Sequence, residues 1–293
     1  MTTRTLIFAA LAALMIGSAS GQSASPVELK YKFTPGETTR FRIYQHTTGN
    51  RSITGSSAPS SIDVELTSII RVRCSRIMPS GEAEIAIETE SSVLKIGGRT
   101  ASNPPASEPR TMLIDSRGNV VQPEGAKASP QASRSSKLDF GSVESIALLA
   151  ILPEKPVSTG DTWSAEIPLP ISPGSKLTLS FRLEDVKRSS SGRVAVVKLA
   201  LSTPINADVV AAPPSPQGSQ EGTATLNFDL EKGSLQYAEG SVRSILTTYL
   251  RTPRTLGTAD DAAEQYAVSK FNLESKFAVR RLDETEPGRS GKP

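Results

Sequence analysis

The chain has 293 residues, of which 37% are hydrophobic and 22% are charged, with 33 Lys and Arg against 30 Asp and Glu. This length and apolar content allow one large or two ordinary domains with a sizeable core, and they exclude wholesale disorder. The single Cys and the single His exclude an internal disulfide and a Cys/His zinc site, and any Ser-His-Asp mechanism would have to use His46.

Residues 1–21 have the features of a secretory signal peptide. Arg4 precedes the apolar run Leu6–Ile16, and the small residues Gly17–Gly21 follow it. The run is shorter than the roughly 20 residues that a membrane-spanning helix needs, and a retained signal anchor is the alternative interpretation. We therefore expect an exported protein, periplasmic or secreted and not membrane-spanning, whose net charge falls from +3 to +2 when Arg4 is removed.

Alternation of apolar and polar residues predicts a mainly antiparallel β fold, because parallel strands give unbroken apolar runs instead. The alternating segments, in chain order, are 27–33, 39–44, 62–75, 177–183, 197–201, 224–230 and 270–280. A two-residue loop at Ser80–Gly81 and a three-residue loop at Ser190–Gly192 predict two hairpins and their registers. The predicted opposite pairs are Cys74 with Ile87, Arg73 with Glu88 and Phe181 with Leu201.

Similar motifs occur in the same order in both halves of the chain. Pro35–Thr38 corresponds to Thr159–Thr162, and Met112–Val121 corresponds to Leu226–Leu235. Chance similarity between turn-rich strands is the alternative to duplication. The expected organisation is one β-rich domain over residues 22–283, built from half-repeats 26–122 and 139–250, closed by a strand at 270–280 and followed by a disordered tail at 284–293.

One short central helix is predicted at Ser142–Leu152, because Ser142 can cap it and Pro153 ends it. The fold class is therefore a curved antiparallel sheet, barrel-like or half-barrel, made of two tandem β repeats. Two arrangements are compatible with this pattern, one barrel or two packed sheets, and the apolar interior is either filled or a cavity.

The stretch Pro153–Trp163 has the pattern Pro-x-x-x-Val-x-x-Gly-Asp-x-Trp. Together with Phe33–Glu37 and Asp229–Gly233, it resembles an uncharacterised family of exported bacterial β-rich proteins, a domain of unknown function. The resemblance implies a periplasmic or cell-surface location, and it provides no catalytic residue. From the residues themselves, Asp161 is expected to bind backbone N–H groups in the turn and Trp163 to anchor the core.

The residues with chemical potential all have a structural interpretation. Cys74 lies on the apolar face of its strand and is expected to be buried, and His46 lies on a polar face. Asp115 and Asp229 start turns that end in glycine. Ser92–Lys95 matches a Ser-x-x-Lys motif, but that motif should open a helix and here it falls inside a predicted strand. No catalytic, cofactor-binding or metal-ligating residue is predicted, and no cofactor.

The basic residues are dispersed and aromatic residues make up only 5% of the chain, so nucleic acid is not an expected partner. A local patch of Arg40, Arg42 and Arg76 is the candidate for contact with anionic lipid or glycan. The expected function is a non-enzymatic exported protein of the bacterial envelope that binds or scaffolds, with lipid or another envelope component as its partner. The first alternative is a lipid or lipoprotein carrier with an apolar half-barrel cavity, and the second is a hydrolase that uses His46.

Overall fold

The structure is a computed structural model that describes residues 25–56, 58–102, 109–121, 150–168, 176–189, 192–205, 217–251 and 266–282. In these ranges the regular secondary structure is β-strand without a helix, and the prediction of a mainly antiparallel β fold is confirmed. The strands, in chain order, are β1 (Thr38–Ile53), β2 (Ser60–Ile77), β3 (Ala83–Ile96), β4 (Arg99–Ser102), β5 (Arg110–Ile114), β6 (Val120–Val121), β7 (Thr162–Pro168), β8 (Lys176–Ser189), β9 (Gly192–Ile205), β10 (Gln217–Asp229), β11 (Ser234–Arg251) and β12 (Tyr266–Leu282).

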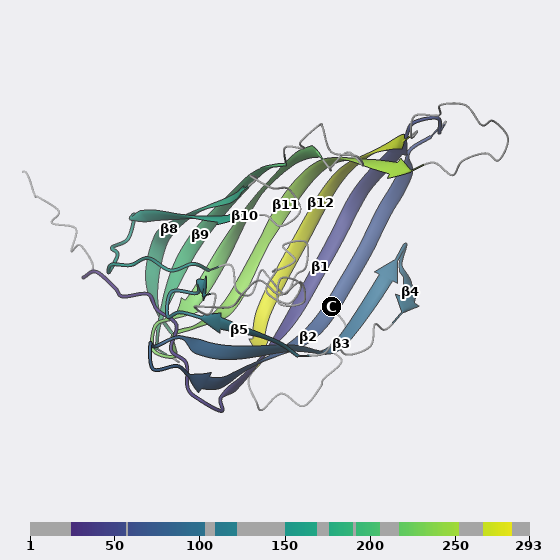
Figure 1. Cartoon of the computed structure of the whole chain (residues 1–293). Coiled ribbons are helices and arrows are strands. Elements are labelled where there is room, and N and C mark those ends of the chain that lie inside the picture. The colour runs from purple at the N-terminus through teal and green to yellow at the C-terminus, as the bar shows by residue number, and fades with distance from the viewer. Residues whose placement is uncertain are drawn as a thin grey trace, which may run out of the picture.

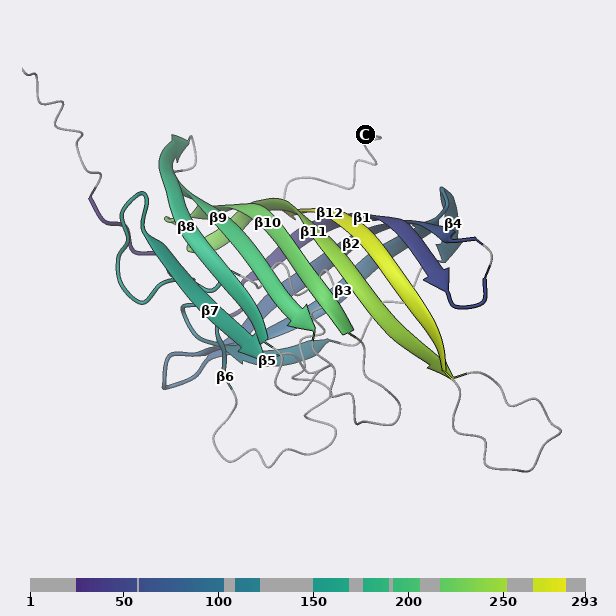
Figure 2. The same ribbon diagram turned by 90° about the horizontal axis from the view of Figure 1, so that it is seen from above.

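The strands form one open 12-stranded sheet in the order β6-β5-β3-β2-β1-β12-β11-β10-β9-β8-β7, and β4 pairs with β3 outside this path. The sheet curves strongly along its width and length (Figures 1 and 2). The first half of the chain starts at β1 in the middle and proceeds to one edge, and the second half starts at the opposite edge and returns to β11. β12 pairs with both β1 and β11 and joins the two halves.

Strand periodicity separates the sheet into two faces. In β8, Leu179 and Leu183 are fully buried, whereas Ser180 and Arg182 are exposed. Cross-strand pairing continues this division, because residues opposite each other point to the same side of the sheet. We call the face that carries the buried residues the inner face and the other the outer face.

The N-terminal segment Pro26–Gly36, which we call the strap, is not a strand of the sheet, although its alternation predicted one. Val27 and Leu29 are buried, and Glu28, Lys30 and Lys32 between them are exposed. The alternation therefore arises because one side of the strap packs against the core and the other side faces solvent. The strap does not join a ladder because its backbone groups bind several loops in turn, and its single bridge joins Val27 to Val157.

The strap crosses the turns at the ends of the two halves. Tyr31 N donates to Ser116 O at 2.7 Å, and Lys32 N donates to Gly233 O at 3.0 Å. A Cβ atom at Gly118 would lie 2.9 Å from the Tyr31 ring, and one at Gly233 would lie 2.6 Å from Lys32 N. Both glycines also have positive φ, so glycine is required there by the backbone and by the close approach of the strap.

Residues 150–160, which we call the central segment, lie beside the strap. The predicted helix Ser142–Leu152 falls outside the described residues except for Ala150–Leu152, which are irregular. Leu152 N donates to Arg117 O at 2.8 Å, a loop partner that replaces a helical one. The predicted role of Asp161 is confirmed, because its Oδ2 accepts from Ser158 N at 2.8 Å.

Trp163 stands at the junction of the central segment and the sheet. Its ring stacks on Phe181 with centroids 5.4 Å apart, and its Nε1 donates to Ile151 O at 2.7 Å. The indole is only partly buried. The prediction that Trp163 anchors the core is confirmed, because its ring packs against the main core on β8. The hydrogen bond to Ile151 adds a role that the sequence did not indicate, since the same ring also holds the central segment.

The main core lies between the inner face and the two covering segments. It joins strap and central-segment residues such as Leu29 and Leu152 to buried residues of β1, β2 and β8–β12. A smaller cluster of Cys74, Ala83, Ile85, Ile87 and Ile114 lies under β2, β3 and β5. The sheet therefore buries its inner face at the strap end.

The predicted hairpin registers are wrong by two residues. Cys74 lies opposite Ile85, and Phe181 lies opposite Leu199. Each loop differs by one residue from the prediction, and the first β-bulge in each hairpin adds one more shift. A shift of two keeps the side chains of the predicted pairs on their predicted faces. A second bulge in the β2–β3 hairpin, between Ile69 and Ile70, reduces the error to one residue farther along the strands. The predicted partner of Arg73 is also replaced, since Glu88 lies opposite Arg71.

The predicted signal peptide at residues 1–21 and the predicted tail at 284–293 lie outside the described residues.

We predict that truncation before Phe271 produces an aggregating protein. The truncation removes most of β12, which pairs with β1 and β11, and leaves two long strands with unpaired backbone groups. Removal of residues 284–293 is the control and should change little. Size-exclusion chromatography checks both variants, and a monomeric, folded protein without residues 271–293 would contradict the prediction.

We predict that Leu29→Ala lowers the free energy of unfolding by about 2–5 kcal/mol, the range for a buried leucine that leaves a cavity. Leu29 is 2% exposed and packs in the main core. The neighbouring Lys30→Ala is the control, because Lys30 is exposed and only pairs with Glu28 at the surface. Urea unfolding measures both, and equal effects would show that the strap does not cover the core in solution.

Candidate functional site

His46 lies on the outer face of β1, and its Nε2 is 2.8 Å from Asp63 Oδ1. Both side chains are partly exposed, at 33% and 50%. Among the described residues, no serine or cysteine lies within hydrogen-bond distance of this ring. A nucleophile, a base and an orienting acid are therefore not assembled at His46 in the described part of the chain.

Cys74 is confirmed as a buried residue of the inner face, with 5% exposure. Burial raises the pKa of its thiol, and the nearby carboxylate of Glu37 adds to this shift. Both effects disfavour the thiolate, which is the reactive form of cysteine. Cys74 has the environment of a structural residue.

The Ser92–Lys95 motif lies within β3, as expected. The hydroxyl of Ser92 is 2.9 Å from that of Ser68 on the inner face, and Lys95 Nζ is 3.0 Å from Glu65 on the outer face. Lys95 therefore cannot activate Ser92, because the sheet lies between the two side chains.

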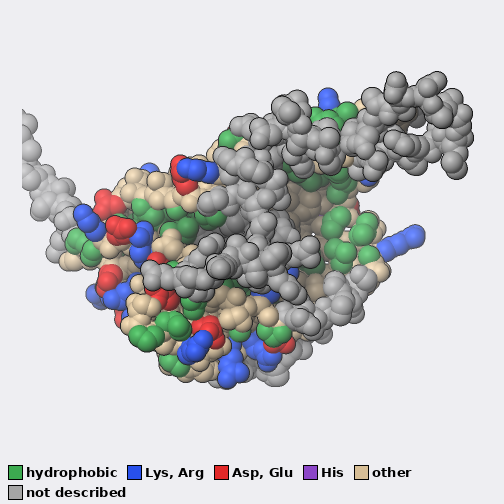
Figure 3. Space-filling view, viewed as in Figure 1, with side chains coloured by type: hydrophobic (Ala, Val, Ile, Leu, Met, Phe, Trp, Pro, Cys, Tyr) green, Lys and Arg blue, Asp and Glu red, His purple; other side chains and the backbone are tan. Residues whose placement is uncertain are grey.

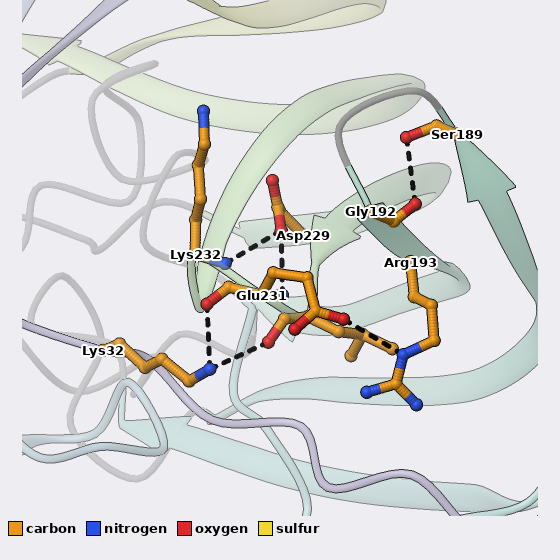
Figure 4. Close-up of polar contacts among 8 residues, drawn as sticks. Lys32, Ser189, Gly192, Arg193, Asp229, Glu231 and Lys232 are labelled. Carbon is orange, nitrogen blue, oxygen red and sulfur yellow. Dashed lines mark hydrogen bonds and ion pairs between the residues drawn. The ribbon is translucent and has the colours of Figure 1, made fainter.

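Asp115 and Asp229 each hold one turn together. Asp115 Oδ1 accepts from the backbone N–H groups of Arg117 and Asn119, at 2.9 and 2.8 Å. Asp229, 1% exposed, accepts from the N–H groups of Glu231 and Lys232, both at 2.9 Å (Figure 4). Both carboxylates serve as turn acceptors, as the Asp-to-Gly spacing predicted.

The strap is also fastened to the Asp229 turn by a side chain. Lys32 Nζ donates to Leu230 O at 3.1 Å and to Glu231 O at 2.8 Å (Figure 4). The Glu231 carboxylate forms an ion pair with Arg193 at 3.1 Å in the same view. The carboxylates of Asp229 and Glu231 are therefore both engaged in structural contacts at the strap end.

The predicted cationic patch is largely neutralised. Arg40 forms an ion pair with Glu90 at 2.6 Å, and Arg76 forms one with Glu84 at 2.7 Å. Arg42 makes no ion pair with another described residue. The prediction missed this pairing because the acidic residues come from β3, whose register brings them beside β1 and β2.

The strap end of the inner face has little room for a ligand. Its apolar cavity measures about 90 Å³ and lies among Phe33, Cys74, Ile85 and Ile114. Ligand pockets usually measure about 300–1,000 Å³. This cavity is therefore too small for a ligand of ordinary size.

Away from the strap, the inner face continues over the far ends of the strands. We call this part the distal inner face; it comprises the inward-facing residues of β1 from Gln45 onward and those beside them in the neighbouring strands. Several of its apolar side chains remain partly or largely exposed, and they include Val64, Leu66, Ile96, Val242, Leu246 and Leu273. Hydrophobic side chains also reach the visible surface around β3 and β4 (Figure 3).

Two hydroxyl groups of the distal inner face bind each other, since Thr47 Oγ1 lies 2.8 Å from Ser275 Oγ in the neighbouring strand. Thr203 Oγ1 is buried and has no hydrogen-bond partner in the described structure.

The outer face carries two open grooves that share Thr223 and Ser241 and measure about 1,030 and 790 Å³. Serine and threonine side chains alternate along them with charged residues of both signs, such as Lys198 and Glu239. The outer face also carries single exposed apolar side chains, Tyr44, Val93 and Ile245. These stand apart from one another, whereas the apolar side chains of the distal inner face lie on neighbouring strands of one concave surface.

The comparisons with known proteins do not identify the chain. No protein family and no curated protein match its sequence. A solved structure of lipovitellin that concerns lipid–protein interactions aligns with 89% of this chain, with a TM-score of 0.43 and 10% identity. The chain spans about 27% of that lipovitellin chain. At this TM-score the likeness assigns neither a family nor a ligand. Among the described residues, no helix is long and apolar enough to cross a membrane.

The sequence pattern does not reveal the distal inner face, because Thr47, Gly49 and Arg51 interrupt the alternation of apolar and polar residues in β1. Counting by two from the buried Ile43 places all three on the inner face. The same count could have identified the distal inner face from the sequence, but only if the strand had been expected to continue to Ile53.

We predict that Cys74 in the native protein reacts with a chromogenic disulfide reagent on the order of 100-fold more slowly than in urea. The thiol is buried and its pKa is raised. The single cysteine makes the signal unambiguous. Equal rates in the native and unfolded protein would contradict the buried position.

Proposed function

We propose that the protein is an exported, non-enzymatic binding protein of the bacterial envelope that holds an acyl chain against its distal inner face. The observation that carries the proposal is the contrast between the two ends of one face. Leu29 and Leu152 fill the face at the strap end, whereas Ile96, 53% exposed, and its aliphatic neighbours remain accessible at the other end.

The dimensions of the distal inner face suit an acyl chain. Arg51 lies six positions after Gln45 in β1, which corresponds to roughly 20 Å of strand. The acyl chains of one bilayer leaflet span about 15 Å, half of the hydrocarbon core. A chain laid along the strands would therefore stay within this surface.

The chemistry of the surface also suits an acyl chain. Leu66, Val242 and Leu273 are aliphatic, and burial of each methylene group of a ligand contributes about 0.8 kcal/mol. Ten buried methylene groups would contribute about 8 kcal/mol, from which the cost of association is subtracted. A long single chain can offset that cost, and a short apolar molecule cannot.

The proposal includes the finer features of the fold. We infer that the curved sheet is a half-barrel and that the two halves are tandem repeats. The order β1-β2-β3-β5-β6 and the order β7-β8-β9-β10-β11 run in the same direction across the sheet. The turns at Asp115 and Asp229 occupy corresponding places in the two series, which a duplication would produce.

We predict that Ile96→Glu weakens the binding of a neutral probe, pyrene-labelled hexadecanol, by at least about tenfold. A carboxylate on the distal inner face would have to be desolvated beneath the chain. Ile245→Glu is the matched control, because Ile245 is 49% exposed on the outer face of β11. Fluorescence titration measures both affinities.

Lipid extraction provides the second measurement. Protein purified from its native envelope should release lipid in a stoichiometric amount by mass spectrometry. A lipid-free protein that also fails to bind the probe would refute the proposal and favour a scaffolding role.

A further inference from the structure

Arg51 is an arginine on the inner face near the far end of β1. It lies opposite Phe271 of β12, and its guanidinium carbon is 5.4 Å from the centre of the Phe271 ring. Its Nε donates to Ser269 Oγ at 2.8 Å, and Ser269 is fully buried. Two contacts from β12 therefore hold the side chain in one orientation over the inner face.

No acidic residue in the described part of the chain compensates Arg51. From Gln45 to the far ends of the strands, the inward-facing positions of β1–β3 and β7–β12 in the described structure carry no Asp or Glu. Arg51 is the only charged residue among these positions. Arg99 of β4, at the rim beyond Ile96, is exposed and has no comparable support.

An inward-facing arginine of β12 shows the contrast. Arg281, at the strap end, lies 3.7 Å from the Glu37 carboxylate and donates to Ser234 Oγ at 2.5 Å. Partly buried charges are normally paired in this way. Arg51 uses its Nε, and its two terminal NH₂ groups have no partner among the described residues.

We propose that Arg51 binds the anionic head group, a carboxylate or a phosphate, of an amphiphile whose acyl chain lies on the distal inner face. This inference rests on the proposed function and names the chemistry of the ligand. A guanidinium with its two terminal nitrogens free makes paired hydrogen bonds to either kind of oxyanion. Phe271 and Ser269 orient the group before the ligand arrives, so little side-chain freedom is lost on binding.

The position of Arg51 sets the direction of the ligand. The residue lies near the distal end of β1, and the filled core begins at the other end of the same strand. The head group at Arg51 therefore stays near solvent, and the acyl chain runs along the inner face toward Gln45. The reverse orientation would place an anion against the buried Phe277, beside Gln45.

The test compares three ligands of equal chain length: hexadecanoic acid, hexadecyl phosphate and the uncharged hexadecanol. Each displaces the pyrene-labelled probe from the full chain, at a pH where both acids are ionised. The variants are Arg51→Gln and, as a control, Arg42→Gln, which removes an unpaired arginine from the outer face of the same strand. Protection of Cys74 from labelling reports that each variant is folded.

We expect the wild-type protein to bind both anionic ligands about tenfold or more tighter than hexadecanol. Arg51→Gln should remove this preference and change the affinity for hexadecanol less than about threefold, and Arg42→Gln should keep the preference. These results would support the head-group site.

Three outcomes would overturn the inference. Equal affinities for charged and uncharged ligands in the wild type, or a preference that survives in Arg51→Gln, would refute the head-group site and leave the acyl-binding function standing. Displacement of hexadecanoic acid by inorganic phosphate alone would show a site for a free anion. Failure of all three ligands to bind would refute both proposals together.

Discussion

Backbone hydrogen bonds hold the strap across the sheet, among them those from Tyr31 N to Ser116 O and from Lys32 N to Gly233 O. A single sheet needs a second layer to bury its apolar face, and here the strap and the central segment supply it. The turns that receive the strap are pinned by Asp115 and Asp229. Burial raises the pKa of the Tyr31 phenol, whose hydroxyl donates to Ala150 O of the central segment at 3.2 Å.

The strap covers only one end of the face, and this partial cover gives the two ends different properties. At the strap end, rings such as Tyr31 and Phe228 pack edge to face at 5.3 Å and leave a cavity of about 90 Å³. At the other end, the same pattern of alternation leaves aliphatic side chains accessible. One continuous sheet thus contains both a packed core, which stabilises the fold, and an open apolar surface, which suits a ligand.

The outer face is organised by charge. Arg71 lies between Glu88 and Glu90, and the hydrogen bond with Glu88, followed by the attraction of the two carboxylates, raises the pKa of its guanidinium. Such exposed pairs contribute little stability, but they leave few free charges on β1–β3. The inner face differs, because its arginine, Arg51, has the hydroxyl of Ser269 and the ring of Phe271 as neighbours and no described acidic residue. This asymmetry is why an arginine on the inner face points to a ligand, whereas several arginines on the outer face do not.

The sequence alone determined which side chains share a face, because strand periodicity places Leu179 and Cys74 inward whatever their partners are. It also determined the turns, because Asp161 and Asp229 bind their own local backbone. It did not determine the register of the hairpins, since a bulge after Leu183 depends on the neighbouring strand. Nor did it reveal the strap, whose alternation is indistinguishable from that of a strand until its backbone partners are known. Only the tertiary structure decided how far the strap covers the inner face and that Arg51 has no described acidic neighbour. Both depend on contacts between residues far apart in the sequence, such as Arg51 and Ser269, which are more than 200 positions apart.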